Sequence, residues 1–380
     1  MNSKKIRDIT FYLHRYIGLF VGLILIIVGL TGSLLVFQKE IDHSLISHQF
    51  GHIVPQGEKI SVAAALDTVK AAFANTPDLK VSSITTLPGA EEPYTFWLTS
   101  SEDKRTQVFV NPYTAKILGS RVWDSTLIGL TFKLHYQLLG GEIGTYIVGV
   151  AALLLFILCV TGLVLWPGWR KLISGFKIKW QAHPKRVNFD IHKVSGIVTV
   201  VFLSLLAFTG FCWNFYDFAK PVIYAVTLSP NPAEPVFLPI AKKSPLSTRK
   251  LLQKADAALP GAVTTYVSLP QTPEGIFRVG KKLPHESNEY GESEVYLDRF
   301  SGKVAKLQNS LKASLGDRVL NSFTPLHYGT FGGLLTRILY VFVGLAPLIL
   351  SVTGFVMWWY RRRSKSKQQI VAEKLPNSLP

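Results

Sequence analysis

The chain has 380 residues, of which 48% are hydrophobic, and a formal net charge of +17. Its mean hydropathy is nevertheless positive, so apolar and charged residues must be segregated along the sequence. Both cysteines lie in apolar runs, where no disulfide is expected. A chain with only two cysteines and no CxxC motif cannot form a cysteine-rich metal site or attach c-type haem covalently.

The first predicted element is an apolar run from Tyr16 to Phe37, preceded by Lys4, Lys5 and Arg7. Basic residues also precede the core of a signal peptide. This run is longer than such a core, and no small-x-small cleavage site follows it. We therefore predict a cytoplasmic N-terminus and a retained membrane span within residues 1–37, since about 20 apolar residues cross a bilayer as a helix.

Residues 38–140 form a more polar segment. A helix-like pattern at 61–74 precedes short alternating runs, the clearest of them at 108–118, and together they predict a small α+β domain. Near its start, the spacing of His43, His48 and His52 would let them face one side of a loose helix and bind a metal. Nothing corresponds to them in the second half of the chain, which argues against a metal site here. The metal site nevertheless stays an open alternative.

The rest of the chain repeats this alternation. Residues 214–332 contain a second helix-like pattern at 246–259 and a second strand pattern at 295–305. Lys and Arg crowd the segments 167–189 and 361–380, which places both in the cytoplasm and the two polar segments outside. This topology accounts for much of the positive charge, so no nucleic-acid partner is expected. The remaining predicted segments are a span at 141–166, a basic cytoplasmic loop at 167–189, a span at 190–213, a second α+β domain at 214–332, a span at 333–360 and a basic cytoplasmic tail at 361–380.

Two matching stretches indicate an internal repeat. Residues 134–141 read LHYQLLGG and residues 326–333 read LHYGTFGG. The fold prediction is an integral membrane, α-helical four-span bundle with two extracytoplasmic α+β domains, arranged as a parallel repeat whose pseudo-two-fold axis runs along the membrane normal. Each copy also keeps the distances from its histidines to its Thr-Gly pairs: His135 to Thr161-Gly162, His327 to Thr353-Gly354, His14 to Thr31-Gly32 and His192 to Thr209-Gly210.

The predicted axis pairs these four histidines. It places His14 opposite His192 near the cytoplasmic face and His135 opposite His327 near the outer face. Two imidazoles that face each other in an apolar bundle suit a haem with two axial histidines. Zinc is the main alternative, but it takes three or four protein ligands where each pair offers two.

Arg15 and Lys193 directly follow the two inner histidines. They are candidates for pairing with haem propionates at the cytoplasmic face. They are equally suited to a simpler role as positively charged anchors at the membrane boundary.

The HRYIG opening, the paired LHY…GG stretches, the Thr-Gly pairs and the two outer α+β segments resemble the PepSY-associated transmembrane family, to about residue 360. The resemblance implies a bacterial inner-membrane reductase of ferric siderophores that carries b-type haem, here two haem b per chain. By resemblance, haem ligation falls on His14, His192, His135 and His327. The siderophore itself is not identified by it.

In the reaction that these expectations define, electrons enter at the cytoplasmic face and reduce a ferric siderophore or another ferric chelate outside, releasing Fe(II). Such transfer needs no acid–base group, so no catalytic side chain is predicted. The cytoplasmic segments hold no GxGxxG motif, so we expect a membrane quinol or a cytoplasmic flavoprotein as donor, with membrane lipids as the other partner. The alternative is a haem-free PepSY-type scaffold or regulator of a periplasmic protein, which has no need of histidines in register.

Overall fold

The computed structural model describes residues 3–102, 104–233, 244–272, 275–284, 286 and 288–374. The end of the predicted tail, 375–380, and part of the predicted domain 214–332 lie outside these residues. The chain divides into two compact units. The first comprises Met1–Phe37, Thr131–Ala219 and Phe323–Pro380, and the second comprises Gln38–Leu130 and Lys220–Ser322.

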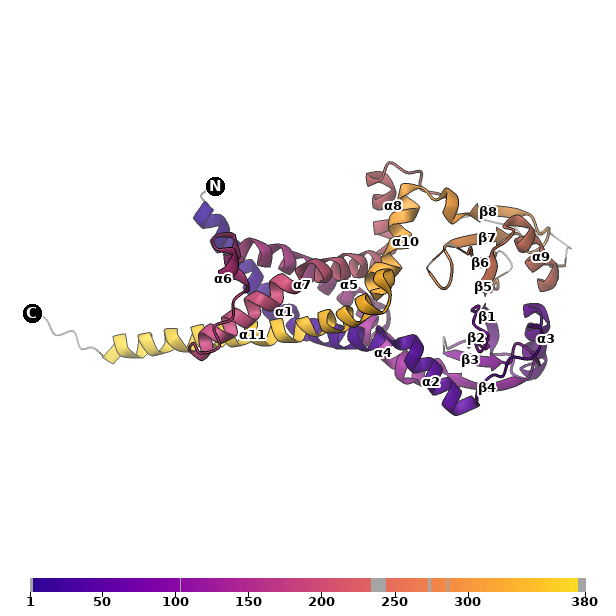
Figure 1. Cartoon of the computed structure of the whole chain (residues 1–380), viewed down its shortest axis with the longest axis horizontal. Coiled ribbons are helices and arrows are strands. Elements are labelled where there is room, and N and C mark those ends of the chain that lie inside the picture. The colour runs from indigo at the N-terminus through magenta and orange to yellow at the C-terminus, as the bar shows by residue number, and fades with distance from the viewer. Residues whose placement is uncertain are drawn as a thin grey trace, which may run out of the picture. The chain divides into compact units, whose positions relative to one another are not determined.

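Four long helices build the first unit: α1 (Ser3–Leu35), α5 (Gly141–Leu165), α7 (Pro184–Asn214) and α11 (Gly333–Lys374). They lie side by side as a bundle (Figure 1). Each is long and apolar enough to cross a membrane, and together they cover the four predicted spans. We call the end where α1 and α7 begin the N-terminal end of the bundle, and the other the opposite end.

Small residues let neighbouring helices of the bundle approach closely. Where α1 meets α11, a Cβ atom on Gly29 would lie 2.4 Å from the carbonyl oxygen of Gly344, so this contact requires glycine. One turn further along α1, the Ser33 hydroxyl donates to the carbonyl of Val341 (2.9 Å). Polar contacts through backbone carbonyls thus hold the two helices in an antiparallel register.

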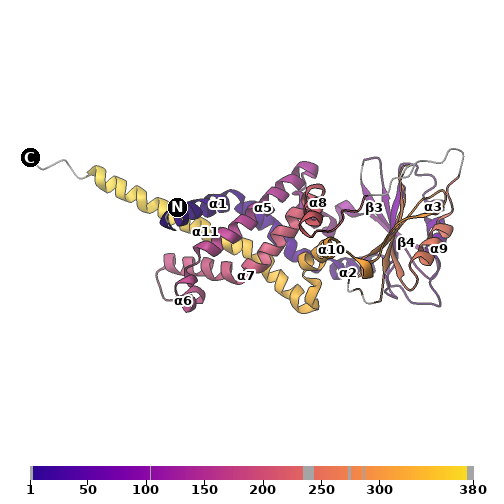
Figure 2. The ribbon, with the colours of Figure 1, turned by 90° about the horizontal axis from the view of Figure 1, so that it is seen from above.

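The second unit is an eight-stranded antiparallel sheet with the order β4-β3-β2-β1-β5-β6-β7-β8. Helices α3 (Val62–Ala72) and α9 (Thr248–Ala258) cover one face of it (Figures 1 and 2). Each helix begins at a serine whose hydroxyl accepts a backbone N–H, Ser61 from Ala64 and Ser247 from Lys250. The strands are β1 (Lys80–Thr85), β2 (Tyr94–Thr99), β3 (Arg105–Val110), β4 (Ile117–Val122), β5 (Val263–Ser268), β6 (Phe277–Lys282), β7 (Ser293–Leu297) and β8 (Val304–Gln308).

The two predicted α+β segments share this one sheet. Strand β1 of the first segment pairs with β5 of the second, with Ile84 opposite Val267. One apolar cluster continues across the junction and includes the fully buried Phe96 and Val279. Both segments have the predicted helix and strands, but they form a single unit, so the predicted count of two separate domains is not confirmed.

Shorter helices connect these elements, and α4, α8 and α10 have residues in both units. They are α2 (Gln38–Phe50), α4 (Leu127–Gln137), α6 (Leu172–Phe176), α8 (Tyr216–Val226) and α10 (Leu315–Tyr328), with 3-10 turns at Trp123–Ser125, Pro167–Trp169, Ser310–Lys312 and Thr330–Gly332.

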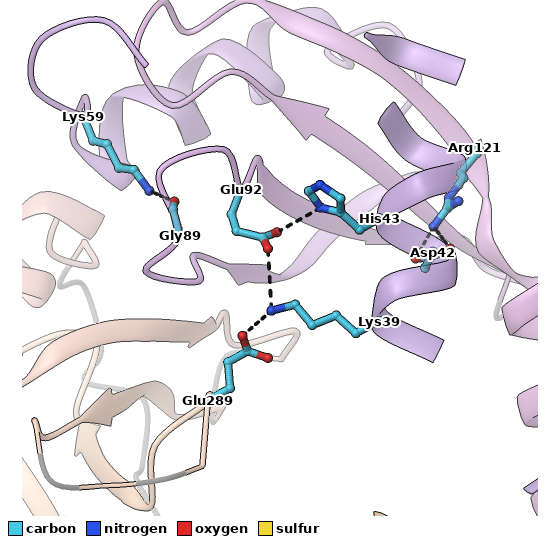
Figure 3. A network of polar contacts seen from close by, with 8 residues as sticks. All are labelled: Lys39, Asp42, His43, Lys59, Gly89, Glu92, Arg121 and Glu289. Carbon is cyan, nitrogen blue, oxygen red and sulfur yellow. Dashed lines mark hydrogen bonds and ion pairs between the residues drawn. The ribbon is translucent and has the colours of Figure 1, made fainter. Parts of the chain in front are cut away.

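Helix α2 is tied to both halves of the second unit by polar contacts (Figure 3). The Lys39 ammonium pairs with Glu289 in the second half and lies 3.6 Å from Glu92 in the first half. Nδ1 of His43 lies 3.9 Å from Glu92. Burial lowers the pKa of Lys39, but the hydrogen bond and charge of Glu289, with the charge of Glu92, outweigh it and raise that pKa above its ordinary value.

A more buried ion pair joins α2 to the edge strand β4. The guanidinium of Arg121 binds both carboxylate oxygens of Asp42 (2.6 and 2.8 Å) and also donates to the side-chain oxygen of Gln107. The Arg121 side chain is only 8% exposed. Breaking such a pair leaves a poorly solvated charge behind.

Replacing Arg121 by Met should therefore lower the free energy of unfolding of the second unit by about 3 kcal/mol, because Asp42 would lose its partner. Thermal unfolding of the full chain in detergent measures the change. Lys104→Met is the matched control, since Lys104 pairs with Glu102 where both side chains are largely exposed. Equal stability of the two variants would contradict a stabilising role for the buried Arg121–Asp42 ion pair.

Candidate functional site: two histidine pairs

The structure brings the four predicted histidines together as two pairs. In the N-terminal half of the bundle, the imidazole centroids of His14 and His192 are 6.2 Å apart. At the opposite end, the centroids of His135 and His327 are 6.1 Å apart. Each pair takes one residue from each half of the chain, as the repeat predicts.

Each histidine bonds a threonine on a different helix. Its Nδ1 lies within hydrogen-bond distance of the hydroxyl of a Thr-Gly pair, and the same hydroxyl donates to the carbonyl four residues earlier in its own helix, at 2.6–2.7 Å. The Nδ1–Oγ1 contacts are His14 with Thr161 (2.9 Å), His135 with Thr31 (3.2 Å), His192 with Thr353 (2.8 Å) and His327 with Thr209 (2.7 Å).

This geometry favours one position for the imidazole proton. A threonine hydroxyl has one proton, and here that proton goes to the carbonyl of its own helix. With its proton on that carbonyl, the hydroxyl accepts from the histidine, which then carries its own proton on Nδ1. For His135, the carbonyl of Val28 is a second acceptor at 2.9 Å. In all four histidines Nε2 is left with a free lone pair, the form in which imidazole binds a metal.

The glycine of each Thr-Gly pair lies against the same imidazole. A Cβ atom on Gly32 would lie 2.9 Å from Cε1 of His135, closer than real Cβ atoms come. At Gly162 the corresponding distance to His14 is 3.3 Å. At Gly210 and Gly354 the corresponding distances to His327 and His192 are 3.6 and 3.5 Å, which is ordinary contact, so the glycine is needed for space chiefly at Gly32.

The repeated glycine pairs near His135 and His327 serve the chain turn that follows. His135 lies near the end of α4 and His327 near the end of α10, and each helix leads into a span. The second glycine of each pair, Gly141 and Gly333, has a positive φ (+58° and +66°) at the start of that span. Glycine adopts this conformation without strain, which explains the matching GG in the two stretches.

A cavity of about 680 Å³ lies around the His14–His192 pair. It runs from Arg7 and Arg361 at the N-terminal end of the bundle to the apolar Leu25 and Leu203 deeper inside. Its volume is within the range of about 300–1,000 Å³ that is usual for ligand sites. The cavity is therefore basic at one end and apolar at the other.

Arg15 and Lys193 both line this cavity, but their environments differ. The Lys193 ammonium already has three acceptors, the carbonyls of Ser174 and Lys177 and the carboxylate of Asp190. It ties α7 to the loop after α5, so a propionate would have to displace one of these contacts. Arg15 has one hydrogen bond from its guanidinium, to the hydroxyl of Tyr16 (2.8 Å), and remains the better candidate.

The structure does not bring His43, His48 and His52, the alternative metal site of the sequence analysis, together as a ligand set. His43 and His48 lie on α2 and His52 follows it, and His43 faces Glu92. Within the residues that the structure describes, no three His, Cys, Asp or Glu side chains gather closely enough to hold a metal ion. This also leaves zinc without its usual three protein ligands among those residues.

The family model described as the PepSY-associated TM region matches residues 11–361. The chain belongs to this family. A comparison with curated proteins gives no match. With its four apolar helices, this PepSY-associated protein is a membrane protein that also carries a PepSY-like unit with an antiparallel sheet.

The histidine pairs of the PepSY-associated protein fit the haem that the resemblance implies. With metal–nitrogen bonds of about 2 Å, imidazoles on opposite sides of one metal ion have centroids roughly 6 Å apart. Both pairs have this separation, and among the described residues the hydrogen bonds of these rings are made by Nδ1, which leaves Nε2 for a metal. The glycines beside the rings and the apolar end of the cavity suit a flat, largely apolar ligand.

The role of Lys193 as a structural anchor can be tested on haem-free protein. Asp190 is fully buried, so Lys193→Met should lower the free energy of unfolding by about 3 kcal/mol. The double variant Asp190→Leu/Lys193→Met should lose less than the sum of the single variants, as a double-mutant cycle of thermal unfolding would show. A destabilisation seen only with haem bound would instead support propionate binding by Lys193.

Proposed function

We propose that this protein is a di-haem b membrane oxidoreductase. It passes electrons from the cytoplasmic side of a bacterial inner membrane to a ferric siderophore or another ferric chelate in the periplasm, where Fe(II) is released. The termini and the basic loop are cytoplasmic, and the PepSY-like unit is periplasmic. A quinol or a cytoplasmic flavoprotein supplies the electrons.

The observation that carries the proposal is the pairing of four histidines in one hydrogen-bonded state. Two pairs, at different levels of an apolar bundle, each hold two imidazoles with ring centroids about 6 Å apart, and in every ring Nδ1 faces a threonine hydroxyl. A scaffold or regulator without haem needs neither the pairing nor the shared tautomer.

The protein's own groups hold and orient the cofactors and keep water away from them. The threonine hydroxyls set the ring orientation, the glycines admit the rings, and the apolar side chains around them exclude water. Each haem, when bound, would supply a one-electron Fe(III)/Fe(II) couple. One electron per ferric ion is all that the proposed reduction consumes, so no side chain has to move a proton to the substrate.

The purified protein should show a low-spin b-type spectrum, oxidised and dithionite-reduced, with two haems per chain by pyridine haemochrome. His135→Ala or His327→Ala should each remove one haem and leave the other, because each breaks only one pair. Protein that is colourless when expressed with haem supply intact would overturn the reductase and favour the scaffold.

The surface residue His183 provides the matched control, since its Nδ1 accepts the backbone N–H of Lys185 and it belongs to neither pair. His183→Ala should keep both haems. Loss of both haems in His135→Ala, in protein that still unfolds cooperatively, would contradict the pairing.

The threonine partners can be tested separately from the histidines. Thr209→Val should lower the affinity for the haem at His327 about tenfold or more, since removal of a ligand's hydrogen-bond partner typically costs this much. The midpoint potential of that haem should also rise, because His327 donates less charge once its N–H loses the acceptor. Redox titration and haem transfer to apomyoglobin measure the two effects.

Thr209→Ser should behave like the parent protein, because it keeps the hydroxyl. Thr199→Val is the control on the same helix, because among the described residues this hydroxyl bonds only the carbonyl of Ser195. An effect of Thr199→Val equal to that of Thr209→Val would show that helix packing, and not the histidine contact, is responsible.

A further inference from the structure

Two residues that line the cavity around His14 and His192 each carry a buried N–H group without an acceptor among the described residues. These groups are Nε of Arg15 and Nε1 of Trp166. Buried donors in folded proteins are nearly always satisfied. Two unsatisfied donors on residues that line one cavity therefore indicate a ligand that brings acceptor atoms.

The Arg15 guanidinium is held in place by its neighbours. Its NH2 group donates to the hydroxyl of Tyr16, and its central carbon lies over the rings of Phe11, Tyr12 and Tyr16 at 4.5–5.4 Å. The aromatic rings orient the charge but offer no strong acceptor to Nε. The charge that would best complete this site is a negative one.

The Trp166 indole, directly after α5, is held by residues of the segment that follows it. Its ring fills the space beside two glycines, where a Cβ on Gly168 or Gly175 would come within 2.4 Å of ring atoms. Trp169 and Phe176 pack edge-on against it, and only 7% of Trp166 is exposed. Trp169 in the same loop donates its Nε1 to the carbonyl of Leu163 (2.6 Å), so the orphaned donor is particular to Trp166.

The residues that line the cavity indicate the chemical class of its ligand. The mouth of the cavity has Arg7 and Arg361 beside Arg15, against the single acidic lining residue Asp8. Lys193 already binds Asp190 and two carbonyls. The acceptor must belong to a molecule whose other end is apolar, because the cavity continues to Leu25 and Leu203. A carboxylate on a large apolar body meets both conditions.

We propose that Arg15 Nε and Trp166 Nε1 form a carboxylate-binding site, and that it takes the propionate groups of the cofactor held between His14 and His192. This proposal rests on the proposed function. It assigns Trp166 a binding role that its position in the sequence does not suggest. Propionate binding, for which the sequence offered Arg15 and Lys193, is thereby assigned to Arg15 and Trp166.

The test compares haemin with haemin dimethyl ester, whose carboxylates are blocked, on full-length apo-protein that carries His327→Ala so that only the inner pair is intact. The parent should release the ester at least tenfold faster than haemin, since a hydrogen bond to a charged group contributes about this factor. In Arg15→Gln and in Trp166→Phe the preference for haemin should fall severalfold, and in the double variant it should disappear.

Arg170→Gln and Trp180→Phe are the matched controls, because both residues are exposed and lie outside the cavity wall. They should keep the parent's preference. The proposal is overturned if Trp166→Phe keeps it too, or if Arg170→Gln reduces it as much as Arg15→Gln does, which would show a diffuse charge effect. Failure of the proposed function looks different, since the parent would then bind neither haemin nor its ester.

Discussion

The hydrogen bond from a histidine Nδ1 to a threonine hydroxyl is the contact on which the rest of this structure depends. Each such bond joins two different helices, so the same contact sets the tautomer of the ring and the register of the bundle. The threonine can serve in this way only because its own proton is taken up by its helix. Side-chain and backbone hydrogen bonding are thus coupled at all four positions.

Hydropathy and repeat spacing were sufficient to predict the four spans, the α+β segments and the two histidine pairs. The Thr-Gly pairs were visible as spacing markers, but their contact with the histidines joins helices far apart in sequence and has no local signal. Lys193 shows another limit. Its neighbour Asp190 lies one helical turn earlier, and only the fold reveals that both are buried and paired, while Trp166 carries no sequence signal for its unsatisfied N–H.

The pairing of the two α+β segments in one sheet likewise could not be predicted from the sequence. Pairing between β1 and β5 buries an edge in each segment that would otherwise present free N–H and C=O groups. Sequence patterns show which residues form strands and which side of each faces a core, but they do not show which edge a strand offers to a distant partner. Helix α2 adds ion pairs to both halves, and these use side chains that look like ordinary surface residues in the sequence.

The strand junction has a consequence for how such an architecture can be assembled. β1 and β5 are the first strands of their respective halves, and they meet antiparallel, as a strand meets its own copy across a homodimer interface. Each histidine pair likewise takes one member from each half. A chain of half this length would therefore contain every part of the fold and yet complete no site until two copies associated. Duplication within one gene would convert that dimer into a monomer and free the two halves to diverge.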